Sequence, residues 1–216
     1  MLYRRKVKRL IDLTGSVLGV VVLSPVIAAI GVAIRCNSEG PALFTQVRVG
    51  LAGQHFKIYK FRTMLRFEDS LLQDGTSIPE RARVTTIGSL LRRTSLDELP
   101  QLINVIRGEM SLVGPRPTLP YQVERYTEHQ KRRLEVRPGM TGLAQVNGRN
   151  RLTWTEKIEL DIEYADSISF VGDLKILLGP FGAVRSTELI YFTAPDDLSA
   201  HDADPLRDVG YQSPAT

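Results

Sequence analysis

The chain has 216 residues, 43% of them hydrophobic and 24% charged, with a formal net charge of +4 at pH 7. These values are ordinary for one substantial globular domain, and they argue against extensive disorder, a multispanning membrane protein or two full domains. Residues 194–216 hold five aspartates and one arginine, which leaves 27 basic and 19 acidic residues elsewhere, and a positive body predicts anionic partners such as phosphate-bearing substrates, nucleic acid or anionic lipid.

A basic cluster and a long apolar run form the amino-terminal segment. Lysine and arginine occupy five of positions 4–9, and no charged residue falls in the 21 positions from Thr14 to Ile34. Since about 20 helical residues rise about 30 Å, enough to cross a hydrocarbon core, we expect membrane contact. Ser24 and Pro25 predict a kink, with Ser24 donating to the carbonyl that proline leaves unpaired. Two arrangements stay open here: a hairpin that enters and leaves on one face, and a bent single-pass helix. The single cysteine, Cys36, cannot form an internal disulfide, which fits a reducing compartment.

Residues 43–63 predict a β-hairpin that turns at residues 51–53. The apolar phase shifts within the second strand, between Ile58 and Tyr59, which predicts either a bulge or burial on both faces. Lys60 and Arg62 should project on one side, because alternate strand residues share a face. Residues 65–83 are charged and contain glycine and proline, so we expect a mobile surface loop there.

A helix is expected next, with Leu99, Leu102, Ile103 and Ile106 on its buried face and Gly108 at its end. Asp97, Gln101 and Asn104 would then form a polar stripe on the opposite face. Residues 111–120 are too rich in proline for a regular element, whereas 121–135 predict a polar helix. A further helix over 153–167 should begin with a capping box of Thr153 and Glu156. Residues 170–192 are apolar enough to lie against a bilayer or to close the core.

Adjacent acids at Asp97 and Glu98 are the sharpest local feature. In one interpretation, Ser95 and Glu98 form a capping box and Asp97 favours the helix dipole. In the other, one carboxylate attacks phosphorus to form an acyl phosphate and its neighbour binds Mg2+, which takes one or two carboxylates together with substrate phosphates.

Basic residues on both sides of these acids are candidate phosphate clamps, because guanidinium groups match phosphate oxygens. Arg116 is held between Pro115 and Pro117, which restricts the backbone that presents it. Each arginine taken alone is equally compatible with an ordinary surface position. Arg92 and Arg93 lie within two turns of the acids, and the candidate clamps are Lys60, Arg62, Arg116 and Arg149. The sequence contains no Walker loop, no GxGxxG fingerprint, and no HExxH or CxxC metal spacing.

Several blocks follow one another from residue 5 to about 180. They are Lys8-Arg9 with Asp12, Ser24-Pro25, Gly40-Pro41 through Phe44, Gln46, Arg48 and Gly50, FKIYKFRTM at 56–64, Ser95-Leu96-Asp97-Glu98, GEMSLVGPRP at 108–117, RPGMTGLAQVNGRN at 137–150, and Trp154 with Lys157, Asp161 and Tyr164. In order and spacing these blocks resemble the monotopic phosphoglycosyl transferases, the bacterial sugar transferase family of polyprenol-phosphate enzymes.

The resemblance implies an α+β fold that is mostly helical, with a small hairpin or sheet, interfacial helices and a re-entrant membrane helix broken at Ser24-Pro25. It favours one-sided insertion, with both flanks at the cytoplasmic face of the bacterial inner membrane. We expect a basic flank and membrane helix over residues 1–36, a catalytic domain over 37–192 and an acidic, mobile tail over 193–216. No multispan region precedes these blocks, as in the minimal form of the family.

The resemblance further implies that Asp97 is the nucleophile and that Glu98 helps to bind Mg2+. The donor would be a UDP-sugar and the acceptor polyprenol phosphate, with undecaprenyl phosphate expected, and UMP would be released in the first membrane step of polysaccharide or glycoprotein glycan synthesis. Exopolysaccharide and lipopolysaccharide synthesis are the expected settings. By the same resemblance, the positions that meet phosphate or substrate are Arg92, Arg116, Arg149, Gln145 and Asp161.

Two other interpretations compete with this one. In a non-catalytic membrane adaptor, Asp97 and Glu98 would only cap a helix. A basic nucleic-acid binder would explain the positive charge, but no recognised nucleic-acid motif is present and the densest basic cluster adjoins the apolar run, so nucleic acid is not an expected partner. The transferred sugar and the oligomeric state, with a homodimer among the alternatives, stay open.

Overall fold

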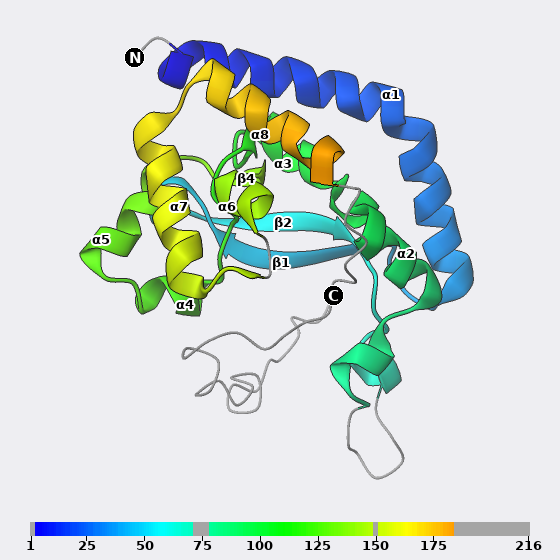
Figure 1. Cartoon of the computed structure of the whole chain (residues 1–216). Helices are drawn as coiled ribbons and strands as arrows, with labels where there is room; N and C mark the ends of the chain where they lie inside the picture. Colours follow the sequence, from blue (N-terminus) through cyan, green and yellow to red (C-terminus); the bar gives the residue numbers. More distant parts are fainter. Residues whose placement is uncertain (1–2, 71–77, 149–150, 184–216) are drawn as a thin grey trace.

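The computed structural model describes residues 3–70, 78–148 and 151–183 (Figure 1). Helices dominate, and two small sheets complete the fold. The helices are α1 (Lys8–Asn37), α2 (Thr86–Thr94), α3 (Gln101–Arg107), α4 (Pro120–Glu124), α5 (Glu128–Lys131), α6 (Leu143–Asn147), α7 (Trp154–Ser167) and α8 (Phe170–Ala183), and the strands are β1 (Leu43–Val49), β2 (His55–Phe61), β3 (Ser111–Val113) and β4 (Gly139–Thr141). A π-helical turn, Tyr3–Val7, precedes α1, and short 3-10 turns lie at Leu51–Gly53, Glu68–Ser70, Glu80–Arg83, Leu96–Glu98 and Arg132–Glu135. The α+β class expected from the sequence is confirmed, while the acidic tail lies outside the described residues.

Helix α1 passes through Pro25 without interruption. It runs along the top of Figure 1 and then turns down the right-hand side. The Ser24 hydroxyl donates to the Val21 carbonyl at 2.8 Å, the group that lacks a partner because proline has no amide hydrogen. The predicted hydrogen bond is therefore confirmed, and the expected break is a bend within one helix.

The outer side of α1 is apolar and exposed. Leu18, Val21 and Val22 are each more than 60% exposed, and the helix is long and apolar enough to cross a membrane. A core helix of a soluble protein would bury such side chains. This surface indicates a membrane protein.

The first turns of α1 are tied to the domain by polar contacts. The Asp12 carboxylate accepts from the Ser111 hydroxyl at 2.8 Å and from the Leu112 amide at 3.1 Å. The Lys8 ammonium lies 2.7 Å from Asp173 on α8, and Arg9 donates to the Val105 carbonyl of α3 at 2.6 Å. Because these partners come from three elements, the start of α1 is fixed against the domain.

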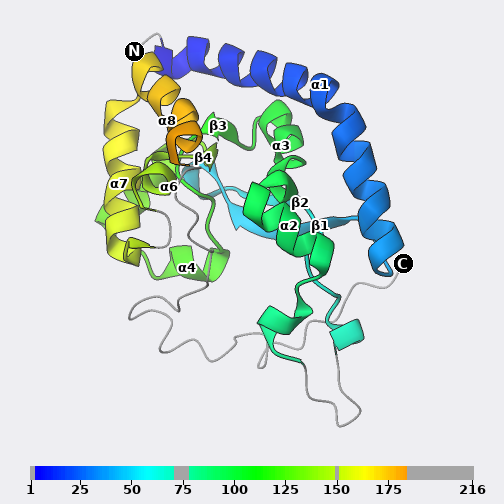
Figure 2. The same ribbon diagram turned by 45° about the vertical axis from the view of Figure 1, so that its right-hand side comes forward.

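The far end of α1 rests on the same domain by apolar contact. Ile34, Phe61 and Leu91 form one buried cluster, which joins the end of α1 to β2 and α2. In Figure 2, α2 and α3 lie under the arch of α1. Both ends of the helix therefore contact one body, with the bend between them.

Strands β1 and β2 form the predicted antiparallel hairpin. Their register runs without interruption from Leu43 opposite Phe61 to Val49 opposite His55, so the phase shift is not a bulge. Ile58 packs on the cluster around Val105 and Met110, whereas Phe61 packs on the end of α1. Strand β2 is thus covered on both faces, the second of the two alternatives.

The prediction for the buried face of α3 was right only in part, because Leu102 is buried as expected but Gln101 and Asn104 of the polar stripe are buried as well. Asn104 is fully buried, while Ile103 is 39% exposed. The Asn104 side chain accepts from the Tyr59 amide at 3.1 Å and donates to the Lys57 carbonyl at 2.7 Å. Helix α3 lies between β2 and α1. Its polar side forms hydrogen bonds with backbone groups on the unpaired edge of β2, and its apolar side faces α1.

The second sheet is small and parallel, and the start of β4 packs backbone to backbone on the residue that follows β3. Strand β3 pairs with β4 through Ser111 opposite Gly139 and Val113 opposite Thr141. A Cβ on Gly139 would lie 2.1 Å from the Gly114 amide nitrogen, so only glycine allows this approach. The close packing fixes the segment that leads to Arg116.

The single polar helix predicted over residues 121–135 is instead α4, α5 and a 3-10 turn. Thr127 begins α5 with a capping box to Gln130, which starts a new helix where continuation was expected. By contrast, the predicted capping box of Thr153 and Glu156 at the start of α7 is confirmed. The apolar segment expected to 192 is helical to Ala183, and its remainder lies outside the described residues.

Candidate active site

The two adjacent acids lie on a tight turn between helices. Ser95 has a left-handed backbone (φ 57°) that ends α2, and its side chain caps nothing. The Glu98 amide donates to the Ser95 carbonyl at 3.2 Å and closes a 3-10 turn. The capping-box interpretation of Ser95 and Glu98 was therefore wrong. Two short elements meet here, so the carboxylates project from a turn rather than from a helix start.

Glu98 is held by two cations. Its Oε1 lies 2.8 Å from the Lys60 ammonium of β2 and 3.0 Å from the guanidinium of Arg116. Burial by itself raises the pKa of Glu98, but Arg116 and Lys60 outweigh it and hold that pKa at about 2. Glu98 is consequently a carboxylate at any physiological pH.

Asp97 experiences the opposite balance. Burial and the neighbouring charge of Glu98 raise the pKa of Asp97, and Lys60 and Arg92 only partly oppose them. Two adjacent carboxyl groups thus have their pKa values pushed apart, a pattern that assigns different roles to paired acids. Glu98 is a fixed anion, and Asp97 is the carboxyl group whose charge is less compensated by neighbouring cations.

Arg92 approaches the acids from the last turn of α2. Its Nε donates to the Thr63 hydroxyl at 2.8 Å. Helix α2 is packed so closely there that a Cβ on Gly88 would lie 1.9 Å from the Thr63 carbonyl oxygen. Glycine at position 88 therefore sets the distance at which α2 presents Arg92.

The structure brings together Asp97, Glu98, Lys60, Arg92 and Arg116, as predicted. It places Arg62 elsewhere, because its guanidinium donates to the carbonyls of Glu39 at 2.6 Å and Ser38 at 2.9 Å, just beyond the end of α1. Strict alternation would put Lys60 and Arg62 on one side, but β2 ends between them, at Phe61. Arg62 thus anchors the membrane helix instead of joining the acids.

The remaining predicted substrate positions have other surroundings. Asp161 on α7 is buried and paired with Arg133. Gln145 lies on α6, where both polar atoms of its amide are buried without a partner among the described residues. Arg149 lies outside the described residues.

Arg48 on β1 belongs to a sequence block that resembles the family, but it was not among the predicted site residues. Its guanidinium donates to the Gln46 side chain at 2.6 Å and to the Pro117 carbonyl at 3.4 Å, next to Arg116. Burial, with the charge of Arg116, lowers the pKa of Arg48 to about 10. Strand alternation was the available signal, because Gln46 and Arg48 lie on the face that carries Lys60.

The arrangement suits a phosphate substrate. Among the described residues, the cations Lys60, Arg92, Arg116 and Arg48 exceed the two acids, so the site carries surplus positive charge for an anion. No group of three metal-ligating side chains occurs in the described part of the chain. A carboxylate dyad nevertheless fits Mg2+, which completes its coordination with water and substrate phosphate.

Comparison with known proteins identifies the family. Residues 3–186 match the family model described as bacterial sugar transferase. An uncharacterised sugar transferase, EpsL of Bacillus subtilis, is 49% identical over 79% of this chain and 83% of its own length. The UDP-glucose:undecaprenyl-phosphate glucose-1-phosphate transferase of Caulobacter vibrioides is 40% identical over 85% of this chain and 72% of its own length.

The relatives differ in length and in the sugar that appears in their names. The galactosyl transferase CpsE of Streptococcus agalactiae is 40% identical over 79% of this chain, but the match spans only 40% of that protein. All these matches cover the segment that contains the acids and their cations. The predicted resemblance is confirmed: the chain belongs to the bacterial sugar transferase family and is an enzyme of the phosphoglycosyl transferase class.

Proposed function

We propose that this enzyme moves a sugar 1-phosphate from a UDP-sugar to polyprenol phosphate, with undecaprenyl phosphate as the acceptor, and releases UMP. The observation that carries the proposal is the pair of acids with divergent pKa values, set among cations beside an exposed apolar helix. The names of the relatives support the donor and acceptor classes. Glucose and galactose both occur in those names, so the proposal leaves the sugar open.

The reaction divides into two displacements at one phosphorus atom. In the first, an Asp97 oxygen attacks the β-phosphorus of the donor, the bond from that phosphorus to the bridging oxygen breaks, and UMP leaves. The phosphosugar remains on Asp97 as an acyl phosphate. In the second, a phosphate oxygen of the polyprenol phosphate attacks the same phosphorus, and Asp97 departs as a free carboxylate. The product is a polyprenyl diphosphate sugar.

The surrounding residues hold charge in place during both steps. Arg92 lies on the Asp97 side, and Arg116 and Lys60 hold Glu98, so each is positioned to meet phosphate oxygens as they approach. Mg2+ held by Glu98 would offset the negative charge of the diphosphate. A carboxylate whose pKa is held at about 2 stays ionised at any physiological pH, which suits that role.

The membrane helix supports one-sided insertion. Its first turns and its last turns both contact the catalytic domain, and a straight crossing would carry one end away from those partners. We therefore propose a re-entrant helix bent at Ser24 and Pro25, with the site at the cytoplasmic face of the bacterial inner membrane. Basic residues at positions 4–9 favour that anionic leaflet.

The test is UMP release from a panel of UDP-sugars with Mg2+, with and without polyprenol phosphate. Without the acceptor, wild type should release up to one equivalent of UMP and gain the mass of a phosphosugar at Asp97. Once the acceptor is added, it should release many equivalents of UMP. Asp97→Asn should fold but do neither. UMP release that needs both substrates at once, with no gain in protein mass, would sink the covalent mechanism. Unchanged turnover by Asp97→Asn would exclude Asp97 as the nucleophile.

A further inference from the structure

Arg133 is a buried cation at the back of the site. It lies in the 3-10 turn before β4, and only 4% of its surface is exposed. Its guanidinium pairs with Asp161 of α7, contacts the Tyr126 hydroxyl at 2.5 Å and donates to the carbonyl of Arg116 at 2.9 Å. A single buried side chain therefore joins α7, the connection between α4 and α5, and the backbone of a site residue.

Stability alone is a weak explanation for this arrangement. Removing two charges from water costs several kcal/mol per ion, and a buried ion pair is often no more stabilising than a well-packed apolar pair. The neighbouring Arg132 already links the 3-10 turn to α7 at the surface, where it lies 2.6 Å from Asp166 of α7. What Arg133 adds is the bond to Arg116.

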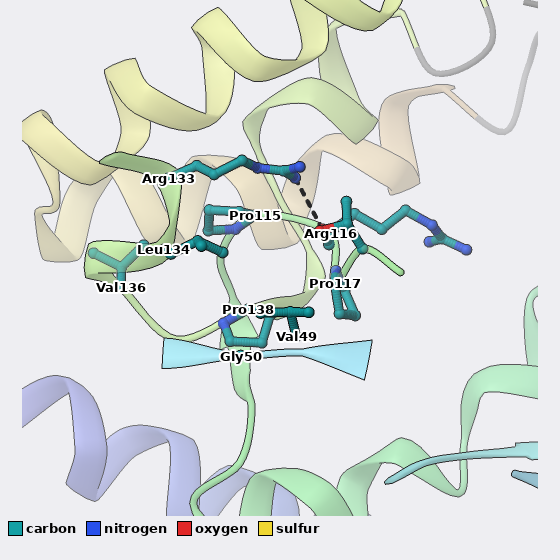
Figure 3. Close-up of a pocket in the computed structure, with 10 residues that line it drawn as sticks. Val49, Gly50, Pro115, Arg116, Pro117, Arg133, Leu134, Val136 and Pro138 are labelled. Carbon is teal, nitrogen blue, oxygen red and sulfur yellow. Dashed lines mark hydrogen bonds between the residues drawn. The ribbon is translucent and has the colours of Figure 1, made fainter. Parts of the chain in front are cut away.

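The backbone around Arg116 is fixed on both sides. The Gly139 amide donates to the Pro115 carbonyl at 2.8 Å, and the Val49 amide donates to the Thr118 carbonyl at 3.0 Å. In Figure 3 the Arg133 side chain lies beside Pro115 and bonds the Arg116 carbonyl, while the Arg116 side chain leads away from that pocket. Arg133 thus holds the backbone at the centre of this segment, where the Arg116 side chain extends to Glu98.

Fixing the backbone matters because the Arg116 side chain is long and 54% exposed, with its far end 3.0 Å from Glu98. Such a side chain loses rotamer entropy whenever it is held in one geometry. A backbone that does not move reduces the number of positions its guanidinium can sample. Misplacement by about 1 Å at a reacting centre can cost on the order of 100-fold in rate.

We propose that Arg133, oriented by Asp161 and Tyr126, is a positioning residue that fixes the Arg116 backbone so that the Arg116 guanidinium meets Glu98 and the substrate phosphate. This inference rests on the proposed function. It also gives Asp161 a supporting role in place of the substrate contact expected from the sequence.

The experiment is a double-mutant cycle on the first half-reaction. The rate of acyl-phosphate formation at saturating UDP-sugar is measured for wild type, Arg133→Lys, Arg116→Ala and the double variant, together with the thermal unfolding midpoint of each. Arg133→Lys should slow the reaction by about 10- to 100-fold. In the Arg116→Ala background it should slow it by less than about twofold, because the residue it positions is gone. Its effect on the unfolding midpoint should be the same in both backgrounds.

A matched control uses the exposed pair that joins the same elements. Arg132→Lys and Asp166→Asn should leave the rate unchanged. If Arg133→Lys proves too unstable to assay, Tyr126→Phe, which removes one hydroxyl, takes its place and should show the same dependence on Arg116 with a smaller effect.

Equal slowing by the Arg133 or Tyr126 variant with and without Arg116 would overturn the positioning role, as would equal slowing by the Arg132 control. If wild type releases no UMP from any donor, the proposed function itself fails and this inference with it.

Discussion

The ammonium of Lys60 lies 2.8 Å from Oε1 of Glu98, and this contact joins strand β2 to the turn that carries both acids. Both side chains are largely shielded from solvent, with 20% and 17% exposed. Arg116 completes the set, and the pKa of Glu98 falls to about 2. The contact is electrostatic support for the turn, and it has a consequence for stability.

The stability contributed by Glu98 should depend on pH. Because its pKa is lower in the folded chain, the contribution is present above the ordinary value of 4.5 and is lost as the pH falls towards 2. At about 1.4 kcal/mol per pKa unit, the drop from 4.5 to about 2 corresponds to about 3 kcal/mol. Denaturant unfolding at pH 6 and pH 3, followed by the fluorescence of the single tryptophan, should show a larger loss for wild type than for Glu98→Gln. Glu128→Gln, which changes an exposed ion pair, should behave as wild type, and equal losses in all three proteins would refute the assignment.

The acid limb of the first half-reaction should report the pKa of Asp97. Burial and Glu98 raise that pKa, so the nucleophile becomes protonated at a higher pH than an ordinary aspartate. Arg92 lowers it, so Arg92→Gln should move the acid limb to higher pH as well as slow the reaction. The measurement is the initial rate of acyl-phosphate formation against pH. Arg93→Gln, at the exposed neighbouring position, is the control and should leave the acid limb at the same pH. An acid limb that does not move in Arg92→Gln would mean that the charge of Arg92 does not affect the pKa of Asp97.

The close approach of α2 to the end of β2 should make Gly88 intolerant of a side chain. An alanine Cβ at position 88 would lie 1.9 Å from the carbonyl oxygen of Thr63, a backbone atom that no side-chain rotation can move aside. We expect Gly88→Ala to cost about 1 to 3 kcal/mol and to slow the reaction, because the shift also moves Arg92. Thermal unfolding and UMP release measure the two effects. Gly31→Ala is the comparison, since a Cβ there meets nothing within 4 Å; similar losses in both variants would argue against the packing explanation.

Local signals in the sequence were enough for the hairpin and for the start of α7. Alternating apolar residues specify a strand, and the capping box of Thr153 and Glu156 needs only neighbours three residues apart. The orientation of α3 was beyond such signals. Its apolar stripe follows helical spacing, but spacing does not reveal whether the stripe faces a core or a membrane helix. Asn104 looked functional because its partners, the backbone groups of Lys57 and Tyr59, lie far away in sequence.

The site shows the same division. Asp97 and Glu98 are adjacent and easily noticed, but Lys60 and Arg116 reach Glu98 from a strand and a loop that only the fold brings together. Arg62 looked equivalent to Lys60 because the alternation of residue types in the sequence continues past the end of β2. In the structure the strand ends at Phe61, so alternation no longer predicts which side Arg62 occupies. The support given by Arg133 could not be predicted, since it depends on a bond to a main-chain carbonyl.

The arrangement of α1 leads to a prediction about membrane topology. Lys8 and Asp12 hold the first turns to α8 and β3, and Ile34 holds the last turns to β2 and α2. If these contacts persist in the bilayer, both ends of α1 must lie on the side of the catalytic domain. A single-pass helix would instead place its first residues on the opposite side and break the contacts of Lys8 and Asp12.

Cysteine labelling separates these arrangements, because the chain has one native cysteine, Cys36, and it is exposed just before the end of α1. Arg4→Cys in a Cys36→Ser background moves the only thiol to an exposed position near the other end. With a membrane-impermeant maleimide, both proteins should react in inside-out membrane vesicles and neither in intact spheroplasts. Reaction of position 4 in intact spheroplasts, with Cys36 still protected, would show that α1 crosses the bilayer. In that case the bend at Pro25 would not return the chain to the face it entered, and the proposed placement of the site would need a different anchor.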